Sequence, residues 1–110
     1  MRNKKIGELG EKLAEQILIS KGYRIIKKNF NCPFGEIDII ALKEDVIAFV
    51  EVKTRLSDDF GTGLEAVRAY KKRHIRNSAN YYLSITGWHN KDVDFQVIEI
   101  SAAHIDKLYF

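Results

Sequence analysis

Two neighbouring stretches, F-G-E-I-D-I-I-A-L at residues 34–42 and V-I-A-F-V-E-V-K-T-R at residues 46–55, decide how this 110-residue chain folds. Both are rich in β-branched and aromatic residues, which favour strands, and the three polar residues between them supply a tight turn. We therefore predict a β-hairpin with strands at 36–42 and 46–54.

Charged residues interrupt both predicted strands. Because side chains alternate between the two faces of a strand, Asp38 is expected to share a face with Glu36, and Glu51 to share one with Phe49 and Lys53. Pairing around the turn then brings Asp38 and Glu51 close enough for one divalent ion to bridge them. The same alternation also fits an ordinary sheet with one face in water. Against that reading, Phe49 lies on the acidic face, and a carboxylate among apolar neighbours costs several kcal/mol unless it is paired or binds a metal.

Two carboxylates and a lysine on adjacent strands are suited to phosphodiester hydrolysis. Hard oxygen ligands hold Mg²⁺ or Mn²⁺, which offsets the charge of the scissile phosphate and lowers the pKa of a bound water. Lys53, two residues beyond Glu51 on the same face, can orient or deprotonate that water and stabilise the developing charge.

The remaining elements follow from hydrophobic periodicity. We predict a helix at 5–19, a strand at 23–28, turn chemistry in N-F-N-C-P-F-G at 29–35, a second helix at 63–84 and a strand at 93–100. The order α-β-β-β-α-β predicts an α/β fold with a mixed sheet and a helix on each side, formed by the whole chain as one domain, residues 1–110.

Each predicted helix has an apolar stripe expected to face the sheet. The first stripe comprises Ile6, Leu9, Gly10, Leu13, Ala14, Ile17 and Leu18. The second comprises Leu64, Val67, Tyr70, Ala79, Tyr82 and Leu83. Thr62 and Glu65 have the spacing of a capping box at the start of the second helix.

Composition limits the partners, metal sites and cellular location that we expect. Lys and Arg number 18 against 15 Asp and Glu, and this net charge of +3 leans towards an anionic partner. The single cysteine, Cys32, cannot form an internal disulfide and has no Cys or His neighbours at the spacing of zinc ligands. The three histidines, His74, His89 and His104, also lack the spacing of metal ligands, and we predict structural or surface roles for these histidines. We expect a cytoplasmic protein without a membrane partner, because the sequence has no signal-peptide core and no apolar run of about 20 residues.

Asp38 followed by Glu51-Val52-Lys53 across a hairpin resembles the D…E-x-K core of the PD-(D/E)XK nuclease superfamily. The whole chain resembles more closely the YraN-like family of small bacterial proteins, described as distantly related to archaeal Holliday junction resolvases. The matching motifs are G-E-K-L-A at 10–14, G-E-I-D-I-I-A at 35–41, F-V-E-V-K-T-R at 49–55, Phe60-Gly61 and the late V-I-E-I. Ile37 stands where the superfamily name records a proline, which leaves the motif shorter.

The resemblance implies a restriction-endonuclease-like core with specific roles for the hairpin residues. Asp38 and Glu51 would be metal ligands, Lys53 the catalytic lysine, and the backbone carbonyl of Val52 a further ligand. Glu11 matches the helix-borne acid that completes the catalytic site in resolvase-like members. An ordinary exposed helical acid would look the same in the sequence.

A group of basic residues is a candidate nucleic-acid surface. Its members are Arg55, directly after the second strand of the hairpin, and Arg68, Lys71, Lys72, Arg73 and Arg76 on the second helix. Cations on one side of a helix contact phosphates without reading sequence. A solvated helix face, and for Arg55 a structural role, fit the same pattern.

The residues and the resemblance together predict a metal-dependent nuclease, or a nuclease-like protein that binds nucleic acid. The resemblance implies an endodeoxyribonuclease of the Holliday junction resolvase-like kind, with branched DNA as one candidate substrate. Cutting a junction symmetrically would require a homodimer, because a junction offers two equivalent scissile sites. Two alternatives stay open, a non-catalytic module that binds structured nucleic acid and a protein-interaction domain with merely amphipathic strands.

Overall fold

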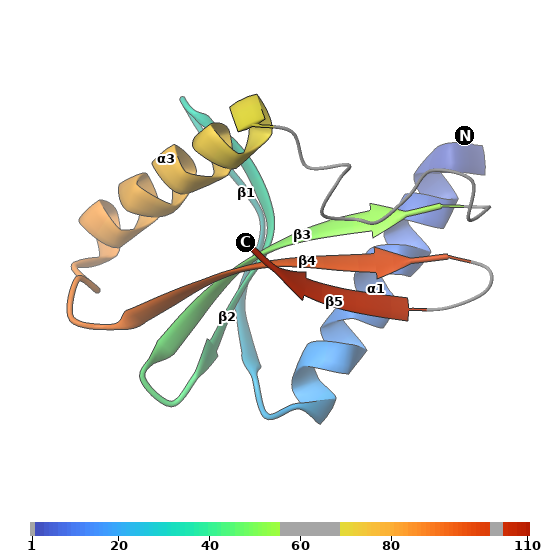
Figure 1. Cartoon of the computed structure of the whole chain (residues 1–110), viewed down its shortest axis with the longest axis horizontal. Helices are drawn as coiled ribbons and strands as arrows, with labels where there is room; N and C mark the ends of the chain where they lie inside the picture. The colour runs from blue at the N-terminus through green and yellow to red at the C-terminus, as the bar shows by residue number, and fades with distance from the viewer. Residues whose placement is uncertain (1, 56–68, 102–104) are drawn as a thin grey trace.

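The computed structural model of the chain describes residues 2–55, 69–101 and 105–110, and two helices and five strands lie within these ranges (Figure 1). In chain order they are α1 (Arg2–Ser20), β1 (Arg24–Cys32), β2 (Gly35–Lys43), β3 (Val46–Thr54), α3 (Ala69–Thr86), β4 (Asp92–Ile100) and β5 (Ile105–Tyr109). The predicted order α-β-β-β-α-β is confirmed, and β5 follows it as an additional strand. Residues 62–68, with the expected capping box and the start of the second helix, lie outside the described part.

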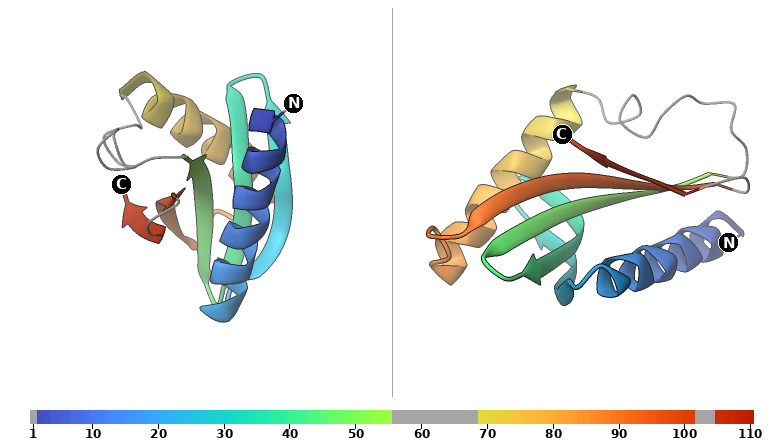
Figure 2. Two further views of the ribbon diagram at one scale, coloured as in Figure 1. Left: turned by 90° about the vertical axis from the view of Figure 1, so that its right-hand side faces the viewer. Right: turned by 60° about the horizontal axis from the view of Figure 1, so that its bottom comes forward.

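The strands form one mixed sheet in the order β1-β2-β3-β4-β5. Neighbouring strands are antiparallel except β3 and β4, which run parallel. A parallel pair needs a crossover connection, and α3 lies in that connection. The two helices lie on opposite faces of the sheet, as Figure 2 shows, so the sheet separates two apolar layers.

The layer beneath α1 consists of Ala14, Leu18, Ile39, Ala41, Ala48, Val50, Ile98 and Ile100. The layer beneath α3 consists of Phe30, Ile37, Ile40, Ile47, Phe49, Ala79, Tyr82 and Leu83. In β3, Ile47 and Phe49 face α3 whereas Ala48 and Val50 face α1, as alternation predicts. The predicted burial of Ala79, Tyr82 and Leu83 is also confirmed.

The apolar stripe of α1 is narrower than predicted. Leu9 and Leu13 are 61% and 46% exposed, because the helix approaches the sheet along the line of Gly10, Ala14 and Leu18 instead. At Gly10 a Cβ would collide with the side chain of Thr54 in β3, so only glycine permits this approach. The close approach rotates the two leucines towards solvent.

The stretch that we predicted as turn chemistry is mostly strand. β1 continues through Asn31 to Cys32, and only Pro33 and Phe34 form the turn into β2. Asn29 adopts a φ of 51°, and Phe30 next to it is only 7% exposed. An asparagine tolerates the left-handed conformation better than most residues, so a local turn signal is accommodated within a strand.

The regular alternation predicted for β2 is wrong at Asp38. Ile37 belongs to the layer beneath α3 and Ile39 to the layer beneath α1, although a regular strand would place both on one face. The β1–β2 pairing skips this point, since Lys28 pairs with Ile39 and Phe30 with Ile37. The irregularity frees Asp38 from the ladder. Within the described residues, no helix is long and apolar enough to cross a membrane.

Candidate active site

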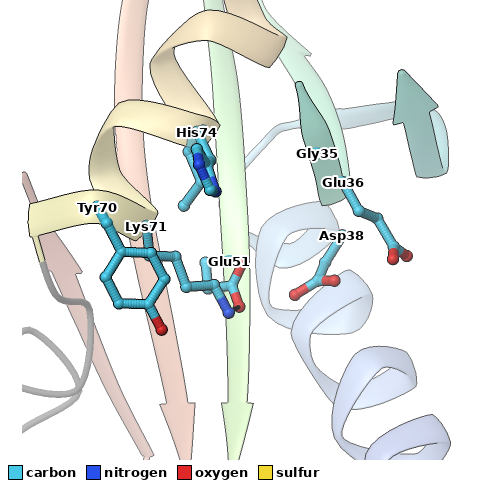
Figure 3. Close-up of a pocket in the computed structure, with 8 residues that line it drawn as sticks. Gly35, Glu36, Asp38, Glu51, Tyr70, Lys71 and His74 are labelled. Carbon is cyan, nitrogen blue, oxygen red and sulfur yellow. Dashed lines mark ion pairs between the residues drawn. The ribbon is translucent and has the colours of Figure 1, made fainter. Parts of the chain in front are cut away.

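A pocket of about 320 Å³ opens where the N-terminal end of α3 passes over β2 and β3 (Figure 3). It is lined by Gly35, Glu36, Asp38, Glu51, Tyr70, Lys71, His74 and Ile75. Asp38 and Glu36 come from β2, Glu51 comes from β3, and the last four come from α3. The hairpin thus supplies the acids and the helix supplies the lysine and the rings.

Asp38 occupies the gap between the two strands of the hairpin. Backbone pairing of β2 with β3 ends at Ile39 and Val50, and Asp38 Oδ2 then accepts a hydrogen bond of 2.8 Å from the Val52 N–H. The carboxylate therefore replaces the next rung of the ladder. Burial and then the nearby charge of Glu51 raise the pKa of Asp38 to about 7, although the hydrogen bond from Val52 opposes the shift.

Glu51 is the most enclosed acid that lines the pocket, with 7% of its side chain exposed, and two lysines approach the same carboxylate oxygen. Lys71 Nζ lies 2.7 Å from Glu51 Oε1, and Lys53 Nζ lies 3.7 Å from it. Burial and then Lys71 lower the pKa of Lys53. Burial also lowers the pKa of Lys71, but its bond to Glu51 outweighs this, so that pKa lies above its ordinary value.

Glu11 of α1 interacts electrostatically with the pocket acids Glu36 and Glu51. It is half-buried, and burial followed by the charges of Glu36 and Glu15 raises its pKa, with a smaller contribution from Glu51. The close approach of α1 at Gly10 holds Glu11 at this end of the sheet. Glu15, one turn further along α1, is largely covered, and its Oε1 lies 3.6 Å from Lys28 Nζ.

The donors fit a small hard cation held by few protein ligands. Asp38 and Glu51 offer carboxylate oxygens, and Mg²⁺ needs only one or two of these because it keeps several waters. The Val52 N–H faces β2, and the carbonyl of a strand residue points to the same neighbouring strand as its N–H, so this carbonyl also faces β2, the strand of Asp38. Among residues 2–55, 69–101 and 105–110, no three acidic, histidine or cysteine side chains are arranged to hold a metal by themselves.

The basic residues separate into distinct environments. Lys71 belongs to the pocket, whereas Lys72 lies over the ring of Phe110 and Arg76 lies over the rings of Phe95 and Phe110. Arg73 is exposed. Arg68 lies outside the described residues.

Arg55 contacts an acid that the sequence did not single out. Its Nε lies 3.6 Å from Oε2 of Glu99, which is 3% exposed. Glu99 pairs in register with Lys53, so it extends the charged face of β3 onto β4. The sequence could have indicated its position. In V-I-E-I at 97–100, Glu99 lies between Ile98 and Ile100, whose side chains belong to the layer beneath α1, so alternation places Glu99 on the opposite face of the sheet.

Sequence reasoning also missed two ring residues that line the pocket. Tyr70 was predicted to be buried but is 56% exposed, and His74 was predicted to be a structural or surface residue. Their rings meet edge to face with centroids 5.9 Å apart. Helical periodicity placed Tyr70 near the edge of the apolar stripe, and only the position of α3 on the sheet decides on which side of that edge it lies.

Comparison with known proteins places these motifs in a family. The UPF0102 protein of Clostridium perfringens strain 13 is 51% identical over 104 residues, which are 94% of this chain and 84% of that protein. The UPF0102 protein of Clostridium acetobutylicum is 46% identical over 107 residues, 97% of this chain and 88% of that protein. The UPF0102 protein of Alkaliphilus metalliredigens is 43% identical over 108 residues, 98% of this chain and 95% of that protein. The family model described as "Uncharacterised protein family UPF0102" matches residues 10–100, and the chain therefore belongs to the UPF0102 family.

Proposed function

We propose that this UPF0102 protein is a metal-dependent nuclease that hydrolyses DNA phosphodiester bonds. The observation that carries the proposal is the meeting of Asp38 and Glu51 from adjacent strands with two ammonium groups on one Glu51 oxygen. An acid such as Asp38, with a pKa raised mainly by burial and then by a neighbouring charge in a cleft, is a candidate functional residue. The resemblance of this hairpin to the PD-(D/E)XK nucleases, and of the chain to Holliday junction resolvases, supports the same reaction.

In the proposed mechanism Asp38 and Glu51 hold Mg²⁺ or Mn²⁺, with the Val52 carbonyl as a further ligand. The ion would supply positive charge at the scissile phosphate and acidify a water. Lys53 sits 3.7 Å from the Glu51 carboxylate and has a lowered pKa, which suits a group that takes a proton from water. Glu11 contributes further negative charge near the cation site from α1.

Lys71 has a different part because it stays charged. Its raised pKa keeps the ammonium protonated, and its side chain is 33% exposed at the pocket. A cation on Glu51 would compete with Lys71 for the carboxylate. The released ammonium can then pair with a phosphate oxygen of the substrate and stabilise the charge that develops there.

The test is cleavage of labelled single-stranded, duplex, flapped and four-way-junction DNAs with Mg²⁺ or Mn²⁺. Asp38→Ala and Lys53→Ala are compared with Asp92→Ala and Lys21→Ala, which remove exposed residues of the same types far from the pocket. We expect metal-dependent cutting that both site variants lose and both controls keep. Cutting that survives in Asp38→Ala would refute the assignment of the site.

A branched substrate would require two copies of the chain, one for each equivalent scissile strand. Light scattering of the protein with and without junction DNA checks this extension of the proposal. A monomer under all DNA-bound conditions would limit the activity to unbranched substrates. The setting that fits a DNA-cleaving protein of this kind is the cytoplasm.

A second candidate function is a non-catalytic module that binds structured nucleic acid. The 2.7 Å contact of Lys71 with Glu51 favours it, because an acid already neutralised by a lysine needs no metal. This function predicts DNA affinity that survives Asp38→Ala and Glu51→Ala, with no cutting of any substrate. A protein-interaction domain would instead show no salt-dependent DNA binding in a gel-shift titration.

A further inference from the structure

Four exposed or half-exposed ring side chains line up from the pocket along the outer edge of α3. Tyr70, His74 and Tyr81 belong to the helix, and Phe34 belongs to the turn between β1 and β2. Tyr70, Phe34 and Tyr81 are 56%, 47% and 37% exposed. We call these four residues the aromatic row.

Helix geometry places the members of α3 on one line. Tyr70 and Tyr81 are eleven residues apart, which is close to three full turns and about 16 Å along the axis. His74 lies one turn from Tyr70, and its ring contacts Tyr70 at 5.9 Å between centroids. At the far end Tyr81 lies 6.0 Å from Phe34. The row therefore starts at the pocket and ends at the β1–β2 turn.

The row is not part of the core that attaches α3 to the sheet. That attachment uses Ile75, Ala79, Tyr82 and Leu83, all of which are buried. Tyr81 meets the buried ring of Phe30 at 6.3 Å between centroids, and 37% of it stays exposed. Exposed rings that contact each other in pairs, Tyr70 with His74 and Phe34 with Tyr81, make this edge a candidate binding surface.

The charges beside the row identify what it would bind. Between Ala69 and Thr86 the helix contains four basic residues and no acid, and exposed Arg73 lies next to the line of Tyr70. Lys71 reaches the pocket from the adjacent position. Exposed rings with Arg73 and Lys71 beside their pocket end match a chain of bases and phosphates, whereas an apolar protein partner gains nothing from the cations.

We propose that the aromatic row binds a single-stranded segment of nucleic acid as it leaves the Asp38–Glu51 pocket, with bases stacked on the rings and phosphates paired with the neighbouring cations. Bases within a duplex already stack on each other and cannot reach the rings. A stacked strand rises about 3.4 Å per nucleotide, so the row spans up to about five nucleotides. The inference rests on the proposed function only in taking nucleic acid as the ligand, and it narrows the substrate to one with unpaired bases.

The experiment measures binding without cutting, in EDTA. Ten-nucleotide dT and rU strands and a blunt duplex are titrated by fluorescence anisotropy, and a dT strand with one 2-aminopurine reports base stacking directly. The variants are Tyr81→Ala and Phe34→Ala, with Tyr81→Phe as the variant that keeps the ring. Tyr109→Ala is the matched control, because Tyr109 is also an exposed tyrosine but lies on β5.

We expect the single strands to bind more tightly than the duplex. Each alanine variant of the row should lose at least about fivefold in affinity, the lower end of what one stacked base contributes. Tyr81→Phe and Tyr109→Ala should bind within about twofold of the unmodified protein. The 2-aminopurine emission should be quenched by the unmodified protein and by Tyr81→Phe but not by Tyr81→Ala. Comparable binding of dT and rU would mean that the row recognises bases and phosphates. A preference for one strand would mean that the row also distinguishes the sugar.

Unchanged affinity in Tyr81→Ala and Phe34→Ala would overturn the inference, as would a duplex that binds as tightly as the single strands or the absence of any binding. These outcomes are separate from those of the cleavage test. Row variants that lose binding in a protein that never cuts would leave the inference standing without the nuclease. Metal-dependent cutting by a protein whose row variants bind with unchanged affinity would support the nuclease and refute the inference. Circular dichroism of each variant confirms that the fold is retained.

Discussion

Lys71 Nζ of α3 lies 2.7 Å from Glu51 Oε1 of β3, and this contact ties the crossover helix to the centre of the sheet. Replacing Lys71 by methionine keeps the length of the side chain and removes its charge. We expect Lys71→Met to lower the free energy of unfolding by about 1–3 kcal/mol, because it leaves the enclosed Glu51 with only the more distant Lys53. Urea denaturation at pH 7 measures the change.

Lys72→Met is the matched control for this substitution. Lys72 is equally half-buried on the same helix, but its ammonium lies 6.0 Å from the ring of Phe110 and not on an acid. Its loss should cost less than about 1 kcal/mol. Equal effects of the two substitutions would mean that the Glu51 contact adds no stability.

Asp38 should make the metal-free protein less stable as the pH rises. Its pKa is raised from 3.8 to about 7 in the folded chain, so the folded state binds the proton more tightly than the unfolded state. The stabilising effect is complete below about pH 4 and is lost as the pH rises through 7. In EDTA, Asp38→Asn should remove this slope and raise the free energy of unfolding at pH 8 by roughly 2–4 kcal/mol relative to the unmodified protein. Parallel pH profiles of the two proteins would contradict the assignment.

Divalent metal should have its largest effect where Asp38 is ionised. A cation binds the carboxylate and not the acid, so Mg²⁺ must displace the proton at low pH. We expect Mg²⁺ to raise the melting temperature clearly at pH 8 and little at pH 5.5. Asp38→Asn should abolish the difference. A melting shift that does not depend on pH would place the ion elsewhere.

Gly10 should be essential for the position of α1. In Gly10→Ala the new methyl group would collide with the Thr54 side chain, whose β-branch gives it little freedom to move. The expected cost is about 1–3 kcal/mol of stability, together with a shift of Glu11 relative to the pocket. Gly7→Ala is the control in the same helix, because among the described residues nothing outside the local helix backbone lies within 4 Å of the place that its new methyl group would take. It should stabilise the protein by up to about 1 kcal/mol. The double variant Gly10→Ala, Thr54→Ala should recover part of the loss.

Ser78 offers a substitution in the opposite direction. Its hydroxyl is fully buried beneath α3, and it makes no hydrogen bond to the described residues. Ser78→Ala should therefore leave the stability unchanged or raise it slightly, since an unsatisfied buried hydroxyl costs about 1–3 kcal/mol. Ala79 is the buried neighbour of Ser78, and Ala79→Ser should lower the free energy of unfolding by about 1–3 kcal/mol, the cost of an unsatisfied buried hydroxyl. Thermal melts of both variants test the pair, and a marked loss in Ser78→Ala would reveal a hidden partner.

The sequence predicted those parts of the fold that depend on regular periodicity. The hairpin of β2 and β3 and the two faces of β3 follow directly from alternation, and so does the common face of Glu51 and Phe49. Alternation could not predict the side-chain direction of Asp38, because the pairing breaks there and no residue type signals which way the carboxylate turns. The strand β5 was missed because it is a short edge strand, for which composition is a weak guide.

The helices show a different limit. Periodicity identifies the apolar side of a helix but not the centre of that side. A rotation of the helix about its axis by the angle of one residue decides whether a residue at the edge is covered, such as Leu13 in α1 or Tyr70 in α3. In α1 that rotation is set by a tertiary contact, Gly10 against Thr54, which no local pattern contains. The contact of Lys71 with Glu51 likewise depends on where the crossover places α3.

From the parallel pairing of β3 with β4 we expect an order in which the pocket becomes complete during folding. Asp38 and Glu51 meet through a hairpin with a two-residue turn, and such local contacts form early. Lys71 reaches Glu51 only when α3 docks on the sheet, and parallel strands joined by a crossover form late because a long loop must close first. We therefore expect the two acids to meet before Lys71 reaches them, so the hairpin on its own holds two neighbouring carboxylates without their nearest cation.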